Sequence, residues 1–195
     1  ADCIIHAGDF TMGGSMKEVV KFLGWYSVLP YKYKVLVAGN HDWLAEKDPS
    51  FMALMCDQQG IIYLNDSSVT LDGVKVHGSP VTPWFHDWAF NRKRGDEINR
   101  HWNLIPEDTD VLITHGPPYS IFDTTGGEEV GCKDLFYKLA KVSPKYHVFG
   151  HIHEGYCIGR ANFFGSGGMT CINASTLDED YRVKNKPVLF EITGE

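Results

Sequence analysis

The chain has 195 residues, of which 43% are hydrophobic and 22% are charged, and its formal net charge is −7 with neutral histidines. This length is typical of a single domain over residues 1–195. No apolar run approaches the ~20 residues that cross a bilayer, so we expect no membrane contact. The acidic balance argues against nucleic acid, whose binding depends on basic contacts to phosphates, and favours a small phosphorylated substrate.

The five cysteines are widely spaced, odd in number and without a C-x-x-C pair. This pattern differs from that of a disulfide framework or a zinc knuckle, and it is typical of reduced thiols. We therefore expect a cytoplasmic protein.

The first half of the chain alternates between predicted strands and helices. Strands are predicted over 3–8 and 33–39, with an amphipathic helix over 15–29 between them and Ser15 as its N-cap. A second helix over 49–58 follows Pro49. Short strands are predicted over 61–64, 68–71 and 74–79, and Asp72-Gly73 between the last two is a strong hairpin turn signal.

The second half begins with an aromatic-rich surface segment over 80–102 that leads into a short helix over 96–103. A strand over 109–116, a glycine-rich loop over 124–131 and a helix over 132–143 follow. Closing strands are predicted over 147–153, 163–175 and 187–193. Mixed βαβ units and hairpins indicate an α/β fold with two packed sheets and helices outside them.

Polar side chains gather where four of the apolar strands end. The segments are 4–10, 35–42, 111–118 and 147–155, and the candidate residues in them are Asp9, Asn40, His41, Asp42, His115, His151 and His153. Ligands collect beyond the carboxyl ends of parallel strands. One histidine alone is more often structural, but oxygen and imidazole donors at four strand ends together indicate a divalent metal centre.

The spacing between Asp9 and Asn40 indicates that the first two strands end at the same edge of a sheet. Asp9 and Asn40 are 31 positions apart, which is about the length of one βαβ unit. His115 precedes a rigid Gly-Pro-Pro turn. The other histidines are expected to be structural, whereas His86 and Asp87 are weaker candidates for the wall of a substrate cleft.

Four blocks carry a resemblance to a known family: Gly8-Asp9, Gly39-Asn40-His41-Asp42, His115-Gly116 and Gly150-His151-Ile152-His153. They resemble the calcineurin-like metallophosphoesterases. The residues that flank these blocks are similar to those of the metallophosphoesterase-domain subgroup with cyclic-nucleotide phosphodiesterase activity. The resemblance implies a four-layer α/β/β/α sandwich of two mixed sheets flanked by helices. It also implies two divalent metal ions, commonly manganese, iron, zinc or magnesium.

The resemblance further implies a role for each site residue. Asp9 would bridge both metals, His153 would bind one of them, and the other would be completed by Asn40, His115 and His151. His41 would donate a proton to the leaving oxygen or stabilise phosphoryl charge. Asp42 would orient His41, as second groups commonly do for imidazoles.

The family's first block, Asp-X-His at the end of an opening strand, does not precede Asp9 here. We therefore expect an N-terminally truncated domain with the opening strand missing, in which one metal is well held and hydrolysis is impaired. The expected activity is that of a metal-dependent phosphoric ester hydrolase, in which an activated hydroxide attacks a phosphodiester such as a cyclic nucleotide, or a phosphomonoester. The alternatives are a nuclease of the same superfamily and a non-catalytic scaffold; the oligomeric state stays open.

Overall fold

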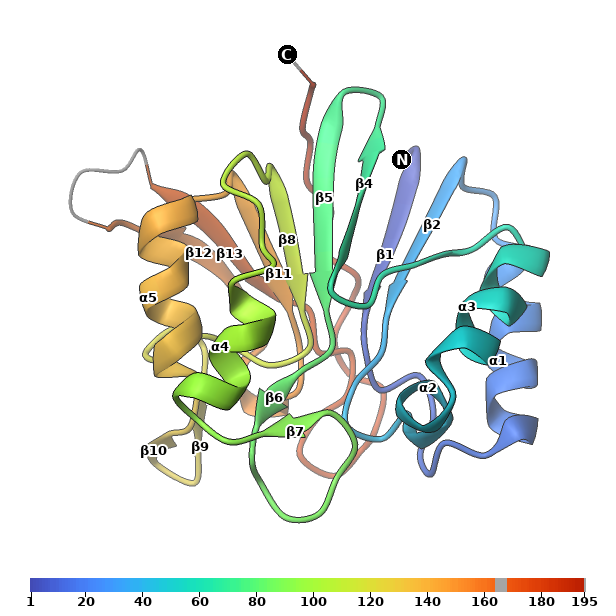
Figure 1. Ribbon diagram of the computed structural model, residues 1–195, viewed down its shortest axis with the longest axis horizontal. Coiled ribbons are helices and arrows are strands. Elements are labelled where there is room, and N and C mark those ends of the chain that lie inside the picture. The colour runs from blue at the N-terminus through green and yellow to red at the C-terminus, as the bar shows by residue number, and fades with distance from the viewer. Residues whose placement is uncertain (164–167, 195) are drawn as a thin grey trace.

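The computed structural model describes residues 1–163 and 168–194, and two sheets packed face to face form its centre (Figure 1). The smaller sheet has the parallel order β1-β2-β3, and the larger one has the order β12-β13-β11-β8-β5-β4. The strands of the two sheets are β1 (Cys3–Ala7), β2 (Tyr33–Val37), β3 (Ile62–Tyr63), β4 (Ser67–Leu71), β5 (Val74–Ser79), β8 (Val111–Thr114), β11 (Tyr146–Phe149), β12 (Cys157–Ala161) and β13 (Met169–Asn173).

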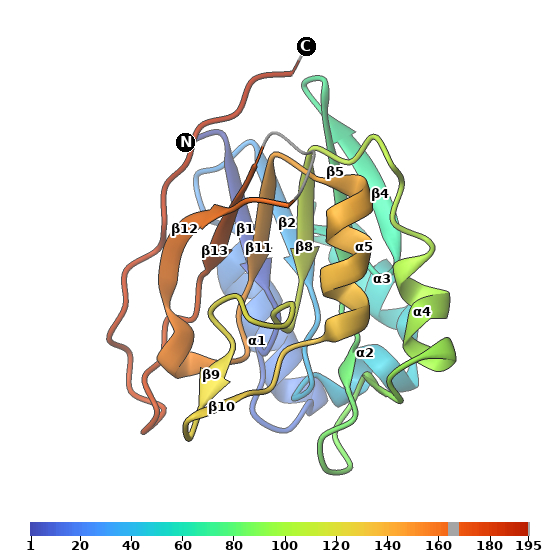
Figure 2. The same cartoon turned by 90° about the vertical axis from the view of Figure 1, so that its left-hand side faces the viewer.

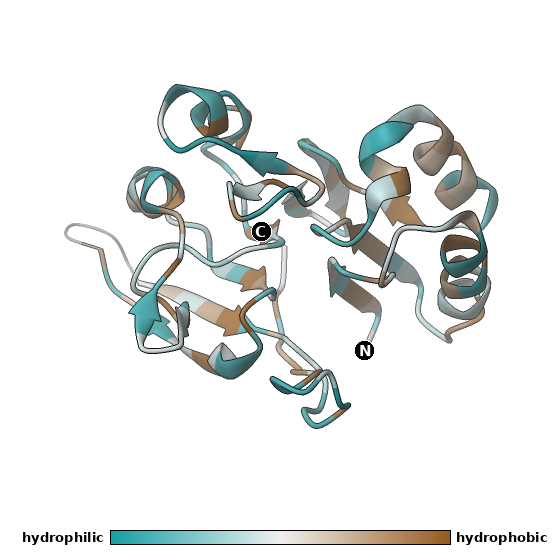
Figure 3. Ribbon diagram, turned by 90° about the horizontal axis from the view of Figure 1, so that it is seen from below, coloured by the Kyte–Doolittle hydropathy of each residue, from teal (hydrophilic) through white to brown (hydrophobic). Residues whose placement is uncertain are grey.

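Helices cover the outer face of each sheet. The helices α1 (Met16–Ser27), α2 (Trp43–Lys47) and α3 (Pro49–Gln58) pack on the smaller sheet, and α4 (Asp96–Trp102) and α5 (Lys133–Val142) pack on the larger one (Figures 1 and 2). Apolar clusters fill the space between the sheets and beneath each helical layer. Seen from below, hydrophobic colour is concentrated on the strands (Figure 3). The predicted α/β/β/α sandwich is confirmed.

Short elements lie at the lower edge of the sandwich in Figure 1, where the parallel strands end. They are β6 (Thr82–Pro83) with β7 (Asn91–Arg92), the hairpin of β9 (Thr124–Thr125) and β10 (Glu128–Glu129), and the 3₁₀ turn η1 (His153–Gly155). The predicted loop over 124–131 therefore contains a small hairpin. Among the helices of the described residues, none has the length and apolar character needed to cross a bilayer.

Local sequence signals account for several of these elements. Ser15 caps α1 in a reciprocal arrangement with Glu18, whose carboxylate accepts from the Ser15 backbone N–H at 2.9 Å. Asp72 and Gly73 both have positive φ and join β4 to β5 as an antiparallel hairpin, as predicted. The predicted helices over 49–58, 96–103 and 132–143 correspond to α3, α4 and α5.

The strand predicted over 187–193 is wrong. Its alternate side chains Val188, Phe190 and Ile192 do pack on the core between the sheets, but the segment is not assigned as a strand and runs beside the N-terminus (Figure 2). The alternation of apolar and polar residues indicated that one face of the segment is buried, whereas a strand also needs a paired backbone. The strand at the β13 end of the larger sheet is the largely exposed β12, which pairs antiparallel with β13.

Two further strand predictions change in extent. The strand predicted over 147–153 ends at Phe149, so both histidines of the His151-Ile152-His153 block lie beyond it. Of the strand predicted over 163–175, residues 169–173 form β13. Residues 164–167 lie outside the described part of the chain.

We expect the buried imidazole of His147 to make stability fall in acid. Its Nε2 lies 2.8 Å from Thr114 Oγ1, and burial lowers its pKa from 6.5 to about 3. The unfolded chain therefore takes up a proton near pH 6.5 while the folded chain stays neutral, which costs the folded state about 1–2 kcal/mol between pH 6.5 and 5. Urea denaturation at these pH values should show a shallower pH dependence for His147→Gln than for the wild type. The exposed His86→Gln serves as control, and equal pH slopes in His147→Gln and the wild type would contradict the assignment.

Candidate metal centre and active site

The candidate metal ligands all lie just beyond the carboxyl ends of parallel strands. Asp9 follows β1, Asn40 follows β2, His115 follows β8 and His151 follows β11. Strands β1 and β2 are adjacent and parallel, so the predicted shared edge for Asp9 and Asn40 is confirmed. Asp9 and His151 both have positive φ, 57° and 68°, which turns their side chains out of the strand direction.

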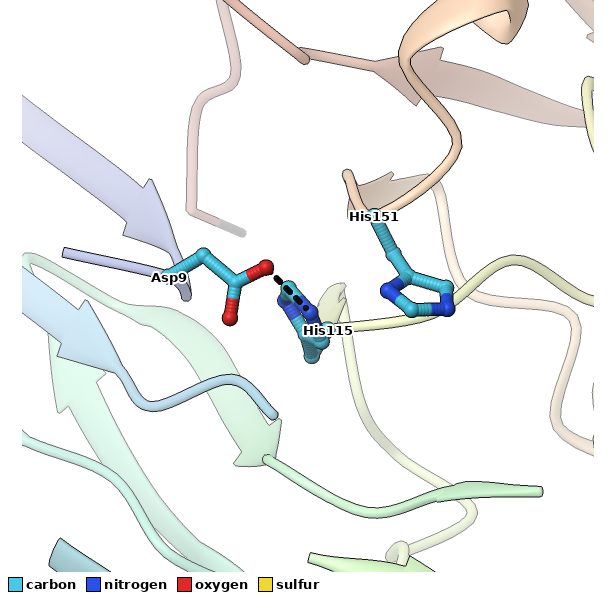
Figure 4. Close-up of side chains that lie close together, drawn as sticks. All are labelled: Asp9, His115 and His151. Carbon is cyan, nitrogen blue, oxygen red and sulfur yellow. Dashed lines mark ion pairs between the residues drawn. The ribbon is translucent and has the colours of Figure 1, made fainter. Parts of the chain in front are cut away.

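Three of these residues point toward a common centre (Figure 4). One ligand atom each from Asp9, His115 and His151 lies within 4.8 Å of the others. The Nε2 atom of His115 is 3.1 Å from Asp9 Oδ2 and 2.9 Å from Asn40 Oδ1. The donor set is thus a carboxylate, an amide oxygen and two imidazoles, which suits a hard-to-borderline divalent cation.

A backbone carbonyl orients the His115 ring. Its Nδ1 lies 2.8 Å from the Ala7 carbonyl oxygen, so Nδ1–H donates to that oxygen and Nε2 faces Asp9 and Asn40. A hydrogen bond from the far nitrogen of this kind is the usual support for a metal-binding imidazole.

Burial and charge set the protonation states of the cluster. Burial opposes ionisation of Asp9, but the nearby His115 outweighs it and lowers the pKa of the carboxyl. Burial likewise disfavours the charged form of His115, but Asp9 raises its pKa. Burial lowers the pKa of His151 to about 3. Asp9 is therefore ionised and His151 neutral at neutral pH, as metal ligation requires, and a divalent cation would displace the proton that His115 shares with Asp9.

Two glycines leave the space in which these side chains meet. A Cβ at Gly39 would lie 2.4 Å from Asp9 Oδ1 and 2.5 Å from His115 Cε1, and a Cβ at Gly8 would lie 2.4 Å from His115 Nδ1. Neither position accepts a side chain without displacing a ligand. The residues present fit a divalent metal ion.

Asp42 has a different role from the one predicted. Its fully buried carboxylate accepts from the backbone N–H groups of Asp9, Thr11 and Gly39 and from the Thr11 hydroxyl, at 2.7–2.9 Å. The expectation that Asp42 orients the His41 ring is wrong, because these four donors occupy both carboxylate oxygens. Asp42 instead joins the turn after β1 to the turn after β2. Burial, and then the charge of Asp9, raise the pKa of its carboxyl, which Thr11 and Gly39 counteract.

The His41 ring is oriented by a backbone carbonyl. Its Nδ1 lies 2.8 Å from the Met12 carbonyl oxygen, and its ring centroid is 4.5 Å from that of Trp88. The backbone N–H of His41 donates to Asp9 Oδ1 at 2.9 Å. Because Nδ1 is engaged with Met12, Nε2 is the nitrogen left to act on a substrate. The sequence carried no signal for Met12 or Thr11 in these roles, because the hydrogen bonds run to main-chain atoms or across 29 to 31 positions.

His153 is not a member of the three-residue cluster, although it lines the same cavity. It opens η1, where its Nδ1 is 2.9 Å from the Asp178 carbonyl oxygen and its ring is 5.1 Å from the ring of Tyr181. The prediction that His153 binds a different metal ion from the one that Asn40, His115 and His151 complete is compatible with this arrangement. Its role as a ligand stays a prediction.

A cavity of about 530 Å³ opens above the cluster. Its floor includes Asp9, Asn40, His41, His151 and His153. Its walls include two groups of other side chains, namely the aromatic Trp84, Phe85, Trp88 and Tyr181 and the charged Arg94, Glu129, Glu154 and Glu179. His86 and Asp87, the weaker candidates for a cleft wall, are absent from the lining, whereas their neighbours Phe85 and Trp88 are part of it.

A comparison with protein families decides which family these candidate metal ligands are typical of. The sequence model of the calcineurin-like phosphoesterases matches residues 1–155, more than half of the chain and all of the ligand-bearing strand ends. This chain belongs to the calcineurin-like phosphoesterase family. The family carries out metal-dependent phosphoester hydrolysis at a dinuclear centre, in agreement with the donor set described above.

Relatives of known sequence agree with this assignment. Human metallophosphoesterase domain-containing protein 1 is 39% identical over 217 residues, which cover 98% of this chain and 64% of that protein. The UPF0046 protein K07C11.7 of Caenorhabditis elegans is 35% identical over 203 residues, covering 98% of this chain and 68% of its own. The chain thus spans less than two thirds of the human relative.

A solved structure shares the fold. The protein TT1561 of Thermus thermophilus superposes with a TM-score of 0.57, covering 90% of this chain and 77% of that chain at 14% sequence identity. At this identity the likeness concerns the sandwich and the position of its strand ends.

We expect the 195-residue chain to retain one Mn²⁺ or Zn²⁺ ion after dialysis, because Asp9, Asn40, His115 and His151 converge while His153 is not a member of their cluster. Asp9→Asn should weaken retention at least about tenfold, since it removes the anionic ligand. Elemental analysis after dialysis measures both results, with the exposed Asp87→Asn as a control. Two tightly retained ions per chain would contradict the expectation.

Asp42→Asn should loosen both turns, because an amide nitrogen would face a backbone N–H where a carboxylate oxygen now accepts. We expect the free energy of unfolding to fall by about 1–3 kcal/mol and the metal affinity to fall with it. Denaturation with and without Mn²⁺ checks both effects. Asp57→Asn, an exposed position on α3, is the matched control, and wild-type stability in Asp42→Asn would rule out the joining role.

Proposed function

We propose that this chain is a metal-dependent phosphoric ester hydrolase. Its substrates are small phosphodiesters, a class that includes cyclic nucleotides, or phosphomonoesters. The observation that carries the proposal is that two members of the Asp9, His115 and His151 cluster, Asp9 and His151, line a cavity that His41 also lines. The volume of about 530 Å³ falls within the range of small-molecule sites.

In this proposal the residues of the chain hold the metal, position the substrate and donate a proton. When bound, divalent cations act as Lewis acids toward water and the phosphoryl group. Asp9, Asn40, His115 and His151 would hold them. Asn40 and His41 both line the cavity, where donors to the non-bridging phosphoryl oxygens would stabilise the charge that develops.

His41 is the residue placed to move a proton. The carbonyl of Met12 accepts from Nδ1–H, which holds the ring so that Nε2 is the nitrogen directed to the substrate. Trp88 packs on the same ring at a centroid distance of 4.5 Å and restricts its rotation. A proton delivered from Nε2 to the departing oxygen avoids release of a bare alkoxide.

The lining of the cavity disfavours the nuclease alternative. Among the described residues that line it, Arg94 is the single Lys or Arg, and its guanidinium donates to the carbonyl oxygens of Gly131 and Val130 at 2.9 and 2.8 Å. A polymer backbone needs several basic contacts. The intact ligand set likewise disfavours a scaffold, which has no need of converging polar groups.

The test is hydrolysis of bis(p-nitrophenyl) phosphate with Mn²⁺, Fe²⁺, Zn²⁺ or Mg²⁺. We expect metal-dependent turnover, and we expect kcat to fall about 100-fold or more in His41→Ala while the bound metal content is unchanged, because loss of one donor that stabilises the developing phosphoryl charge costs about that much. His86→Ala, an exposed residue outside the lining, is the control. Absence of turnover with all four metals would favour the scaffold, whereas full activity in His41→Ala would contradict the catalytic role of His41.

A further inference from the structure

The mouth of the cavity differs in character from its floor. The floor carries the metal ligands and is suited to a phosphate. The mouth is formed by the loop between β6 and β7, the β9–β10 hairpin, and the segment after β13, which all lie at the lower edge of the sandwich (Figures 1 and 2). Whatever is esterified to the phosphate must lie against these three segments.

One side of the mouth is an aromatic wall. Trp84 and Phe85 are 54% and 59% exposed, and Trp88, which lines the same cavity, packs against His41. Aromatic side chains that line a cavity offer apolar surface to a ligand in it. Tyr181 lines the cavity from the segment after β13, so that two segments of the chain contribute rings to it.

The other charged groups of the mouth are carboxylates. Glu154 accepts a hydrogen bond from the Thr125 hydroxyl, and Glu129 accepts one from Ser120 at 2.6 Å. The hydrogen bond from Ser120 lowers the pKa of Glu129, so it is ionised at neutral pH. Glu179, two residues before Tyr181, is exposed and has no hydrogen bond or ion pair to the described residues.

We propose that the alcohol portion of the substrate carries a quaternary ammonium group, as in a choline phosphodiester, which the aromatic wall and the carboxylates of the mouth hold while the phosphate lies at the floor. The inference rests on the proposed function and narrows its substrate class. Quaternary ammonium groups bind aromatic faces through the ring quadrupole and cannot donate hydrogen bonds, so a wall of rings with peripheral carboxylates suits them.

The carboxylates favour this occupant over a nucleotide that carries further phosphates. An aromatic wall alone would also stack a nucleobase. A nucleotide with further phosphates, however, would bring negative charge toward Glu154 and Glu179, and Arg94 is already engaged with backbone carbonyls. A cation at the mouth and an anion at the floor match the charges of both regions.

Two substrates that differ in one atom provide the direct test. p-Nitrophenyl phosphorylcholine and p-nitrophenyl 3,3-dimethylbutyl phosphate share shape and leaving group, and only the first carries a positive charge. We expect kcat/KM with Mn²⁺ to be about fivefold or more higher for the choline ester. Equal values would overturn the inference while leaving the phosphodiesterase proposal intact. Preference for p-nitrophenyl thymidine 5′-phosphate over the choline ester would favour nucleobase stacking and overturn it as well.

Variants then test which side chains cause the preference for the choline ester. Trp84→Leu retains an apolar side chain without the ring, and Glu179→Gln removes charge at nearly constant shape. Both should reduce the choline preference toward equality, because each removes one of the two attractions. The exposed Glu107→Gln, a matched charge change on the loop after α4, should keep the preference. A preference unchanged in both mouth variants would contradict the proposed contacts.

Binding without turnover separates this inference from the proposed function. Choline added to the protein should quench tryptophan fluorescence saturably, and 3,3-dimethylbutanol should do so more weakly. Trp84→Leu should lose much of the change. If no phosphodiester is hydrolysed yet choline still binds in this manner, the proposed function fails and the cation site stands. If choline produces no saturable change, the cation site fails.

Discussion

The carboxylate of Asp42 holds together the two turns from which much of the site is built. Its four donors come from the turn after β1 and the turn after β2. Asp9 sits in the first turn, and Asn40 and His41 sit in the second. A buried carboxylate is costly unless its oxygens are satisfied, and here backbone N–H groups satisfy them. The same contacts therefore stabilise the fold and position the ligands.

The two sheets contribute different halves of the centre. Asp9 and Asn40 come from the smaller sheet, whereas His115 and His151 come from the larger one. The imidazole of His115 connects the halves, since its Nδ1 lies 2.8 Å from the Ala7 carbonyl oxygen of β1 and its Nε2 faces Asp9 and Asn40. Packing between the sheets, through residues such as Val35, Val37 and Ile113, thus sets the distances within the site.

Much of the ligand set could be predicted because the signal is local. A buried parallel strand is a short apolar run, and a polar residue in the glycine-containing turn after it lies at the ligand-binding edge. Asp9, Asn40, His115 and His151 all follow this pattern. The capping box of α1 and the Asp72-Gly73 hairpin are local in the same sense. The segment over 187–193 shows the limit, since alternation there reports burial of one face without backbone pairing.

By itself the sequence determined the fold class, the residues at the strand ends and the family, because each depends on residue types within a few positions. Tertiary structure alone decided that Asp42 joins two turns, that the Met12 carbonyl orients His41, and that the Asp178 carbonyl lies against Nδ1 of His153. It also decided that exposed aromatic rings and carboxylates share one cavity mouth. These features depend on contacts between main-chain atoms and side chains far apart in the chain, which no local pattern of residue types records.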